Sequence, residues 1–178
     1  MKERSPINMD SFIIQAHSLW LKKWLVLTCG DFEKGTFNAM TVGWGSFGIM
    51  WNKPFAQVVV RPTRYTYEFM EKYESFTLCA FPKEYRKALR VIGSKSGRDG
   101  NKIAEAGLTP IASAKVASPG FAQAELIVEL KKMYWSDFDP DHFLDNTIEN
   151  NYPLKDYHRA YFGEILAINA TPSYNNAK

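Results

Sequence analysis

Cations and hydroxyls are concentrated in "VVVRPTRYTYEF", residues 58 to 69, where an apolar run meets a helical pattern. A helix start leaves backbone N–H groups unpaired and carries a partial positive charge. Arg61 and Arg64 add charge and forked donors, while Thr63 and Thr66 add hydroxyls, so this stretch can bind a phosphate. The alternative is that Thr63 caps the helix and the arginines pair with surface acids. These residues alone leave both readings open.

A second loop, "SGRDGNK", has a similar composition, with Ser96, Arg98, Lys102 and two glycines. Taken alone, it also fits a solvated turn. Two loops suited to anions, together with a glycine-rich strand that contains Trp and Met, indicate a phosphorylated aromatic ligand. Its flat heterocycle would lie against the bent strand, and its phosphate would lie at the helix start.

The glycine-rich segment "GWGSFG" matches the dinucleotide-binding pattern G-x-G-x-x-G through Gly43, Gly45 and Gly48. That fingerprint must open a helix. Here the glycines lead into "IMWNKPFAQVVV", which contains Pro54 and has no helical apolar period. The context therefore excludes a Rossmann site. A strand bend or bulge remains, or a ligand lying close against bare backbone.

An acidic segment, "DFDPDHFLD", resembles a calcium-binding loop through Asp137, Asp139, Asp141 and Asp145. It lacks glycine at the sixth position, and Ile148 stands where a bidentate glutamate is required. We therefore expect no calcium site. Helix capping accounts for these acids.

Histidine and cysteine offer little for a metal site, and we expect none. His17, His142 and His158 are scattered, and Cys29 and Cys79 are far apart with no CxxC pair. Two isolated thiols fit buried positions in a reducing compartment. No serine or cysteine motif marks His158 as a triad base. We expect it to be a half-exposed strand histidine that is satisfied by a neighbour.

The elements that must position these residues are short strands with inserted helices. We expect strands at 24–31, 55–60, 75–81, 124–135 and 157–168, and at 37–51 a strand followed by a glycine-rich bend. We expect helices at 64–73, 83–93, 102–108 and 139–151. About six closely spaced strands favour an antiparallel barrel, mainly β with helical additions, over a doubly wound parallel sheet. The length of 178 residues suits one domain.

Net charge and hydropathy bear on whether the protein binds nucleic acid or a membrane. A net charge of +3 is too small to imply nucleic acid by itself. The N-terminus has no apolar signal region, and "LWLKKWLVLTC" is broken by lysines and too short to span a bilayer. We expect a cytoplasmic protein without a nucleic-acid or membrane partner.

Four segments resemble those of a known family and occur in the same order along the chain as in that family. They are "NAMTVGWGSFGIMWNKP", "VVVRPTRYTYEF", "SGRDGNKIAEAGLTP" and "YHRAYFGEI". They look like the flavin reductase-like, FMN-binding split-barrel proteins, especially the flavoredoxin-like branch. The resemblance covers about residues 24 to 168 of a chain that we interpret as one domain over 1–178. It implies a split β-barrel that binds FMN and works as a homodimer.

The resemblance also assigns roles to residues. Those lining the isoalloxazine and ribityl chain would be Met40, Thr41, Val42, Gly43, Trp44 and Ser46. Those holding the phosphate would be Arg64 and Thr66, helped by Arg61, Thr63 and Tyr65. Those closing over the ligand would be Ser96, Arg98 and Lys102. His158 and Gly163 match the family's H-x-x-x-x-G segment, whose histidine lies near the nicotinamide side of the flavin.

The function implied is an FMN-dependent oxidoreductase that takes electrons from NADH or NADPH and passes them to flavin or another acceptor. Two departures favour the flavoredoxin-like branch: Lys53-Pro54 replaces a pair of prolines, and the phosphate segment is more basic than in the small reductases. The alternative is therefore an FMN electron carrier, which exchanges electrons with a protein partner, or a protein that only binds and stores FMN. Neither of these oxidises a nicotinamide. A split-barrel protein for another phosphorylated cofactor is a third possibility.

Overall fold

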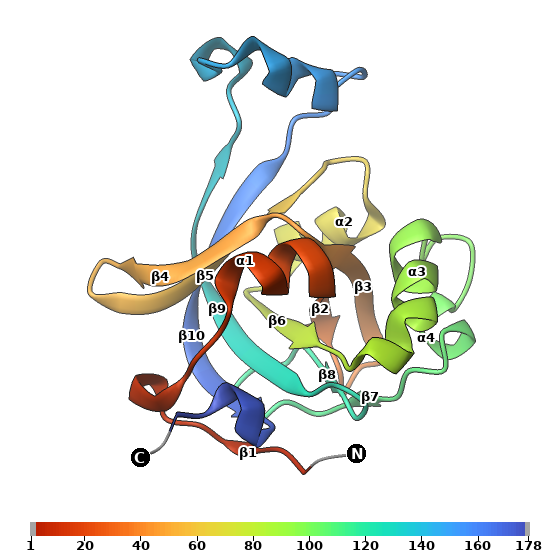
Figure 1. Cartoon of the computed structure of the whole chain (residues 1–178). Helices are drawn as coiled ribbons and strands as arrows, with labels where there is room; N and C mark the ends of the chain where they lie inside the picture. Colours follow the sequence, from red (N-terminus) through yellow and green to blue (C-terminus); the bar gives the residue numbers. More distant parts are fainter. Residues whose placement is uncertain (1–2, 177–178) are drawn as a thin grey trace.

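The computed structural model describes residues 3–176 and consists mainly of one antiparallel sheet that curls into a barrel (Figure 1). Seven strands follow the spatial order β3-β2-β6-β9-β10-β5-β4, and β1 (Ser5–Pro6) pairs with β10. Their bounds are β2 (Leu25–Asp31), β3 (Thr36–Val42), β4 (Gly45–Met50), β5 (Lys53–Val60), β6 (Ser75–Ala80), β9 (Leu126–Asp137) and β10 (Arg159–Ala170). A separate small hairpin joins β7 (Pro110–Ile111) and β8 (Gly120–Phe121). The predicted mainly β fold with inserted helices is confirmed.

The barrel is split between β3 and β4. These two strands are consecutive in the chain, yet they lie at opposite ends of the sheet order and are joined only by Gly43 and Trp44. A Cβ atom at Gly45 would lie 2.3 Å from the Gln57 carbonyl oxygen and 2.5 Å from the Trp20 ring, so only glycine fits where β4 begins. The predicted glycine-rich bend is thus two residues long, and the rest of that segment is a strand that the sequence analysis missed.

Buried side chains lie on both faces of the central strands. Leu25 and Leu27 of β2 point into the barrel, whereas Val26 packs outward with Leu89 and Ile92 of helix α3. Because successive strand residues point to opposite faces, a strand covered on both sides reads as a continuous apolar run. Both cysteines are buried and free, and burial raises the pKa of each thiol to about 12.

Helices cover the barrel at three places. On one side α2 (Tyr65–Lys72) follows β5, and α3 (Arg86–Ser94) and α4 (Lys102–Glu105) follow β6, with a 3-10 turn η3 (Lys83–Tyr85) before α3. The N-terminal segment forms η1 (Met9–Ser11), α1 (Ala16–Ser18) and a π-helical turn η2 (Leu19–Lys23), and η6 (Pro172–Tyr174) lies near the C-terminus. No helix among residues 3–176 combines the length and apolarity needed to cross a membrane.

The connection between β9 and β10, residues 138–158, projects beyond the barrel at the top of Figure 1, and we call it the arm. The single helix predicted for 139–151 is wrong. Two 3-10 turns occur instead, η4 (Pro140–His142) and η5 (Asn146–Asn151). Asp139 and Asp145 each start one turn by accepting a backbone N–H, at 3.0 and 2.9 Å. The capping role is confirmed for Asp139 and Asp145, whereas Asp137 ends β9 and pairs with Arg159. The second cap explains why the helix is interrupted.

Candidate ligand-binding site

Two adjoining hollows lie along β3, with volumes of about 190 and 160 Å³. The first hollow is lined by Met40, Thr41, Val42, Gly43, Trp44, Val59, Arg61, Arg64 and His158. The second hollow is lined by Asn38, Met40, Thr63, Arg64, Tyr65, Thr66, Gly93, Ser94, Lys95, Ser96, Arg98 and Lys102. Met40 and Arg64 belong to both, so the hollows form one continuous site.

The structure brings all but one of the predicted site residues into these two hollows. The exception is Ser46, which lies in β4 and lines neither of them. Its hydroxyl donates a 3.1 Å hydrogen bond to Gln57 on the paired strand β5. The sequence placed Ser46 in a bend beside Gly43, whereas the strand that begins at Gly45 carries it away from the site.

Arg64 lies at the junction of the two hollows. It is the N-cap residue of α2, and among the described residues its side chain makes no capping hydrogen bond. Within residues 3–176 its guanidinium has no hydrogen-bond or ion-pair partner, and its charge lowers the pKa of both Lys102 and His158. An uncapped helix start and an unpaired arginine both favour an anion at this point.

Lys102 contributes a second, buried cation to the second hollow. Only 6% of the residue is exposed, and its Nζ donates to the carbonyl oxygens of Ile92 and Lys95, each at 3.0 Å. Burial, with the nearby charge of Arg64, lowers the pKa of Lys102 to about 8. The ammonium is therefore charged at pH 7 but incompletely compensated, and a bound anion would stabilise it.

Two contacts fix the walls of the second hollow. Thr66 on α2 is buried, and its hydroxyl accepts a 2.8 Å hydrogen bond from Asn38 Nδ2 on β3. Opposite them, a Cβ atom at Gly97 would lie 2.3 Å from Asn38 Oδ1, so glycine allows the 96–101 loop to approach β3. Arg98, at the rim, lies over the Tyr65 ring at 4.9 Å and pairs with Glu68 at 2.5 Å.

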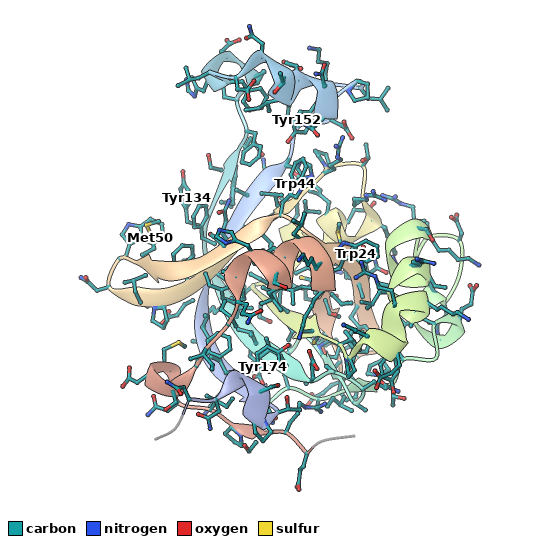
Figure 2. All side chains as sticks on the ribbon, viewed as in Figure 1. Trp24, Trp44, Met50, Tyr134, Tyr152 and Tyr174 are labelled. Carbon is teal, nitrogen blue, oxygen red and sulfur yellow. The ribbon has the colours of Figure 1, made fainter. Side chains whose placement is uncertain are left out.

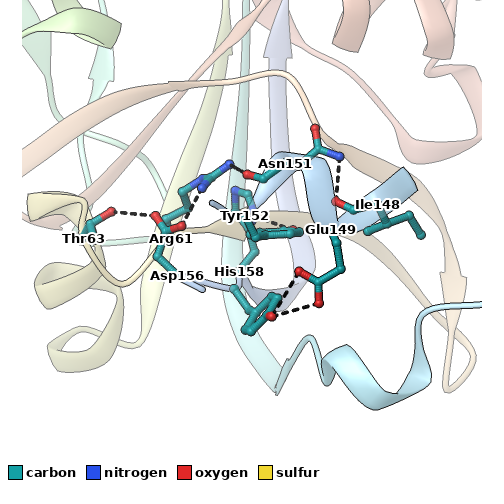
Figure 3. Close-up of polar contacts among 9 residues, drawn as sticks. Arg61, Thr63, Ile148, Glu149, Asn151, Tyr152, Asp156 and His158 are labelled. Atoms are coloured by element: carbon teal, nitrogen blue, oxygen red, sulfur yellow. Dashed lines mark hydrogen bonds and ion pairs between the residues drawn. The ribbon is translucent and has the colours of Figure 1, made fainter. Parts of the chain in front are cut away.

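Arg61 is engaged by the arm, in contrast to Arg64. Its guanidinium donates to Asp156 at 2.8 Å and to the Asn151 carbonyl at 2.7 Å, and it lies over the Tyr152 ring at 5.0 Å (Figure 3). The Thr63 hydroxyl donates to the same carboxylate at 3.4 Å. Both residues line the hollows as expected, but their polar groups are used to hold the arm against the barrel.

His158 lies at the base of the arm, directly before β10, and only 9% of it is exposed. The predicted half-exposed position within a strand is therefore wrong, while the predicted neighbour exists. The Tyr152 hydroxyl lies 2.8 Å from His158 Nδ1, and the Trp44 ring centroid lies 5.0 Å from that of the imidazole. Figure 2 shows Trp44 and Tyr152 together where the arm meets the barrel.

Hydrogen-bond satisfaction fixes the tautomer of His158. Tyr152 is 1% exposed, and within residues 3–176 its hydroxyl has no hydrogen-bond partner besides His158. If the imidazole donated to it, the tyrosine proton would be buried without an acceptor, which is costly. The hydroxyl therefore donates to Nδ1, and Nε2 carries the ring proton.

The imidazole is also neutral at physiological pH. Burial, with a contribution from the charge of Arg61, lowers the pKa of His158 to about 4. The group therefore presents a neutral N–H donor at neutral pH. Sequence reasoning missed Tyr152, because a tyrosine six residues before a histidine in an irregular arm follows no strand or helix period.

Comparisons with known proteins agree with this geometry. A model of the "Flavin reductase like domain" family matches residues 22–145. The fold is similar to flavoredoxin of Desulfovibrio vulgaris, with 21% identity, a TM-score of 0.65, and 84% of this chain and 70% of that chain covered. It is similar to an FMN-binding domain of a flavin reductases-like enzyme from Shewanella baltica, with 17% identity, a TM-score of 0.69 and coverages of 96% and 79%.

A flavoredoxin from Methanosarcina acetivorans is also similar, with 18% identity, a TM-score of 0.65, and 94% of this chain and 73% of that chain covered. A sequence comparison with curated proteins found no match. The family match includes both strands of the split and all of the second hollow, while His158 and Tyr152 lie beyond it. The chain belongs to the flavin reductase like domain family.

Proposed function

We propose that this protein binds FMN and uses it to transfer electrons from NADH or NADPH to a flavin or another acceptor. The observation that carries the proposal is Arg64, whose guanidinium is unpaired within residues 3–176 and lies at the start of α2 between two hollows. The two hollows differ in chemistry, and the difference matches the ring and the phosphate of FMN. The first offers bare backbone and aromatic surface for a flat ring, and the second offers cations for a phosphate.

The chain's own residues suit each part of this ligand. In the first hollow, the edge strand β3 and the Gly43–Trp44 link expose backbone to a ring, and Trp44 is 48% exposed and available for stacking. His158 offers a neutral N–H rather than a proton for transfer at neutral pH. When bound, FMN would supply the hydride-accepting and electron-transferring chemistry, and the protein would supply orientation and electrostatics.

The second candidate function is an FMN electron carrier that does not oxidise a nicotinamide. One observation favours it: the cation peculiar to the first hollow, Arg61, is neutralised by Asp156, and His158 is neutral. The first hollow therefore lacks an additional free cation for the phosphates of a nicotinamide dinucleotide. Under this proposal, electrons would be exchanged with a redox protein partner.

One anaerobic titration separates these functions. The full chain is loaded with FMN, NADH or NADPH is added, and the visible absorbance of the flavin is followed. A reductase bleaches rapidly with at least one nicotinamide. A carrier binds FMN but bleaches no faster than free FMN at the same concentration. A purified, FMN-supplemented sample that retains no flavin would contradict both functions.

We further propose that the protein is a homodimer. Exposed aromatic side chains gather where the β4–β5 hairpin lies near β9 and β10, and Trp51 is 57% exposed. Its ring centroid lies 5.8 Å from that of Tyr134 and 6.5 Å from that of Phe162. Aromatic side chains are enriched in protein interfaces. Light scattering of the full chain tests this proposal, and a monomer mass would contradict it.

A further inference from the structure

A cleft of about 740 Å³ lies between the N-terminal helical segment and the start of α3, and we call it the α3 cleft. Its lining comes from residues within 18–23 and within 81–89, together with Glu125. None of its lining residues lines either hollow of the flavin site. Pockets for small organic ligands have volumes of about 300–1,000 Å³, so the α3 cleft has the size of a separate ligand site.

The charges that line the α3 cleft are mostly positive. There are four cations and two acids: Lys22, Lys23, Lys83, Arg86, Glu84 and Glu125. Lys23 pairs with Glu125 at 2.7 Å, and Glu125 also accepts a 2.6 Å hydrogen bond from the Tyr174 hydroxyl. Within residues 3–176, Lys22 and Lys83 have no ion-pair partner. The cleft therefore keeps an excess of positive charge that a bound anion would compensate.

Arg86 is the cation that the protein holds in one orientation. Its Nη1 donates to the carbonyl oxygens of Lys22 and Lys23, at 2.7 and 3.1 Å, and its guanidinium carbon lies 3.4 Å from the centroid of the Trp24 ring. Nε and Nη2 have no hydrogen-bond partner in the described part of the chain. These two nitrogens form the edge that binds a carboxylate through two parallel hydrogen bonds. The free edge of Arg86 is therefore preorganised for a carboxylate.

The backbone of Trp24 is strained where it supports Arg86. Its φ angle is 60°, in the left-handed region that is uncommon for bulky residues, and it ends η2 directly before β2. Figure 2 shows Trp24 where the N-terminal helical segment lies beside α3. Strained residues of this kind cluster at ligand-binding sites, where the surrounding structure offsets their cost. The strain thus supports a binding role for the ring that lies under the guanidinium.

The α3 cleft also offers apolar surface. Phe81, Pro82 and Leu89 line it, and Phe81 and Leu89 belong to the core cluster under α3. An inorganic anion would contact the cations and leave this surface uncovered. Ligand pockets combine apolar surface with a few placed polar groups, so the lining suits an anion with an apolar body.

We propose that the α3 cleft binds a monocarboxylate with an apolar body. The carboxylate pairs with the free edge of Arg86, and the positive charges of Lys22 and Lys83 attract it to the cleft. The apolar body lies on Phe81 and Leu89. This site is separate from the flavin site, and the inference does not rest on the proposed function.

The test is a calorimetric titration of the full chain, with and without saturating FMN, and its probe is 4-phenylbutyrate. We expect this probe to bind at least about tenfold more tightly than acetate, which lacks the body, and 4-phenylbutanol, which lacks the charge. FMN should change its affinity less than about twofold, because the two sites share no lining residue. Equal affinity for the three probes, no binding of 4-phenylbutyrate, or competition with FMN would overturn the inference.

Arg86→Lys tests the carboxylate contact. It keeps the charge and a donor for the Lys22 and Lys23 carbonyl oxygens but removes the two-nitrogen edge, so 4-phenylbutyrate should bind about tenfold more weakly. Arg90→Lys is the matched control, because Arg90 is an exposed arginine on the same helix that does not line the cleft. It should leave the affinity unchanged. An equal effect of the two variants would overturn the inference.

Lys22→Gln provides a second test that leaves Arg86 in place, so it stays informative if Arg86→Lys does not fold. Lys22 is exposed, and its loss should weaken 4-phenylbutyrate binding about threefold. Unchanged binding in this variant would also count against the proposal. A protein that binds FMN but not 4-phenylbutyrate would contradict this inference alone. A protein that binds 4-phenylbutyrate but no flavin would contradict only the proposed function.

Discussion

Two arginines three residues apart in the chain differ in whether their guanidinium groups are paired. Arg61, in the first hollow, donates to Asp156 and to the Asn151 carbonyl, so its charge is compensated within the protein. Arg64, shared with the second hollow, has no such partner among residues 3–176. Among the described lining residues, the first hollow therefore has one uncompensated cation, the shared Arg64, while the second has two, Arg64 and Lys102. The number of cations in a motif does not define an anion site, because pairing decides which of them remain available to a ligand.

The largest effect should come from Arg64→Ala. A hydrogen bond to a charged group contributes about 1.5–3 kcal/mol, so the affinity for FMN should fall by roughly one to two orders of magnitude. Riboflavin, which lacks the phosphate, should bind the variant as it binds the wild type. Fluorescence titration measures both ligands. An equal loss of affinity for FMN and for riboflavin would contradict the assignment of the phosphate to Arg64 in the second hollow.

Arg61→Ala should affect the arm rather than the phosphate. It removes the partner of the Asn151 carbonyl and leaves Asp156 only the 3.4 Å hydrogen bond from Thr63, so the free energy of unfolding should fall by about 2 kcal/mol. Affinity for FMN should change less than threefold. Denaturant unfolding and flavin titration measure the two quantities. Arg90→Ala, an exposed arginine on α3, is the control that should change neither. If Arg61→Ala lost as much FMN affinity as Arg64→Ala, the proposed difference between the two arginines would be refuted.

The affinity for FMN should depend on pH through the second hollow, whereas the affinity for riboflavin should not. The pKa of Lys102 is about 8 in the free protein, and a bound phosphate favours its charged form. Binding therefore takes up a proton above pH 8, and the affinity for FMN should fall severalfold between pH 7 and pH 9. Lys102→Met should abolish this dependence. A pH profile for FMN as flat as that for riboflavin would show that Lys102 does not contact the phosphate.

The smallest effect should come from Tyr152→Phe, which removes the hydrogen bond to His158. The free energy of unfolding should fall by about 1 kcal/mol. Nitrogen NMR of His158 should show that Nε2 is no longer the sole protonated position, and reduction by a nicotinamide should slow while FMN affinity is kept. Tyr157→Phe is the matched control in the same arm, because its hydroxyl binds Glu149 instead. An unchanged His158 spectrum in Tyr152→Phe would refute the assignment of the tautomer.

Much of the fold could be predicted from local patterns. The apolar runs at 55–60, 75–81 and 124–135 became β5, β6 and β9, because each has a strand-like pattern that needs no tertiary information. Strand β4 was missed because glycine at 43, 45 and 48 indicates a bend, whereas its pairing with β5 depends on a close approach of Gly45 to Gln57 and Trp20. The π-helical turn at Leu19–Lys23 was missed because its apolar residues follow no regular period.

The sequence predicted which residues line the site, but it did not predict the hydrogen bonds and ion pairs that these residues make. Local spacing and family resemblance brought Arg61 and Arg64 together as phosphate ligands, and both do line the hollows. The partner of Arg61 lies 95 residues further along, in an arm whose course the sequence does not reveal. The burial of His158 depends on the same arm. Long-range contacts of this kind determine charge and tautomer, and no local pattern encodes them.

The most direct test of the account is a parallel titration of the wild-type full chain with FMN and with riboflavin. The two ligands share the ring and the ribityl chain and differ only in the phosphate. If Arg64 and Lys102 bind that phosphate, FMN should bind at least about tenfold more tightly than riboflavin, which corresponds to about 1.4 kcal/mol. Equal affinity for the two ligands would contradict the central claim that the second hollow is a phosphate site.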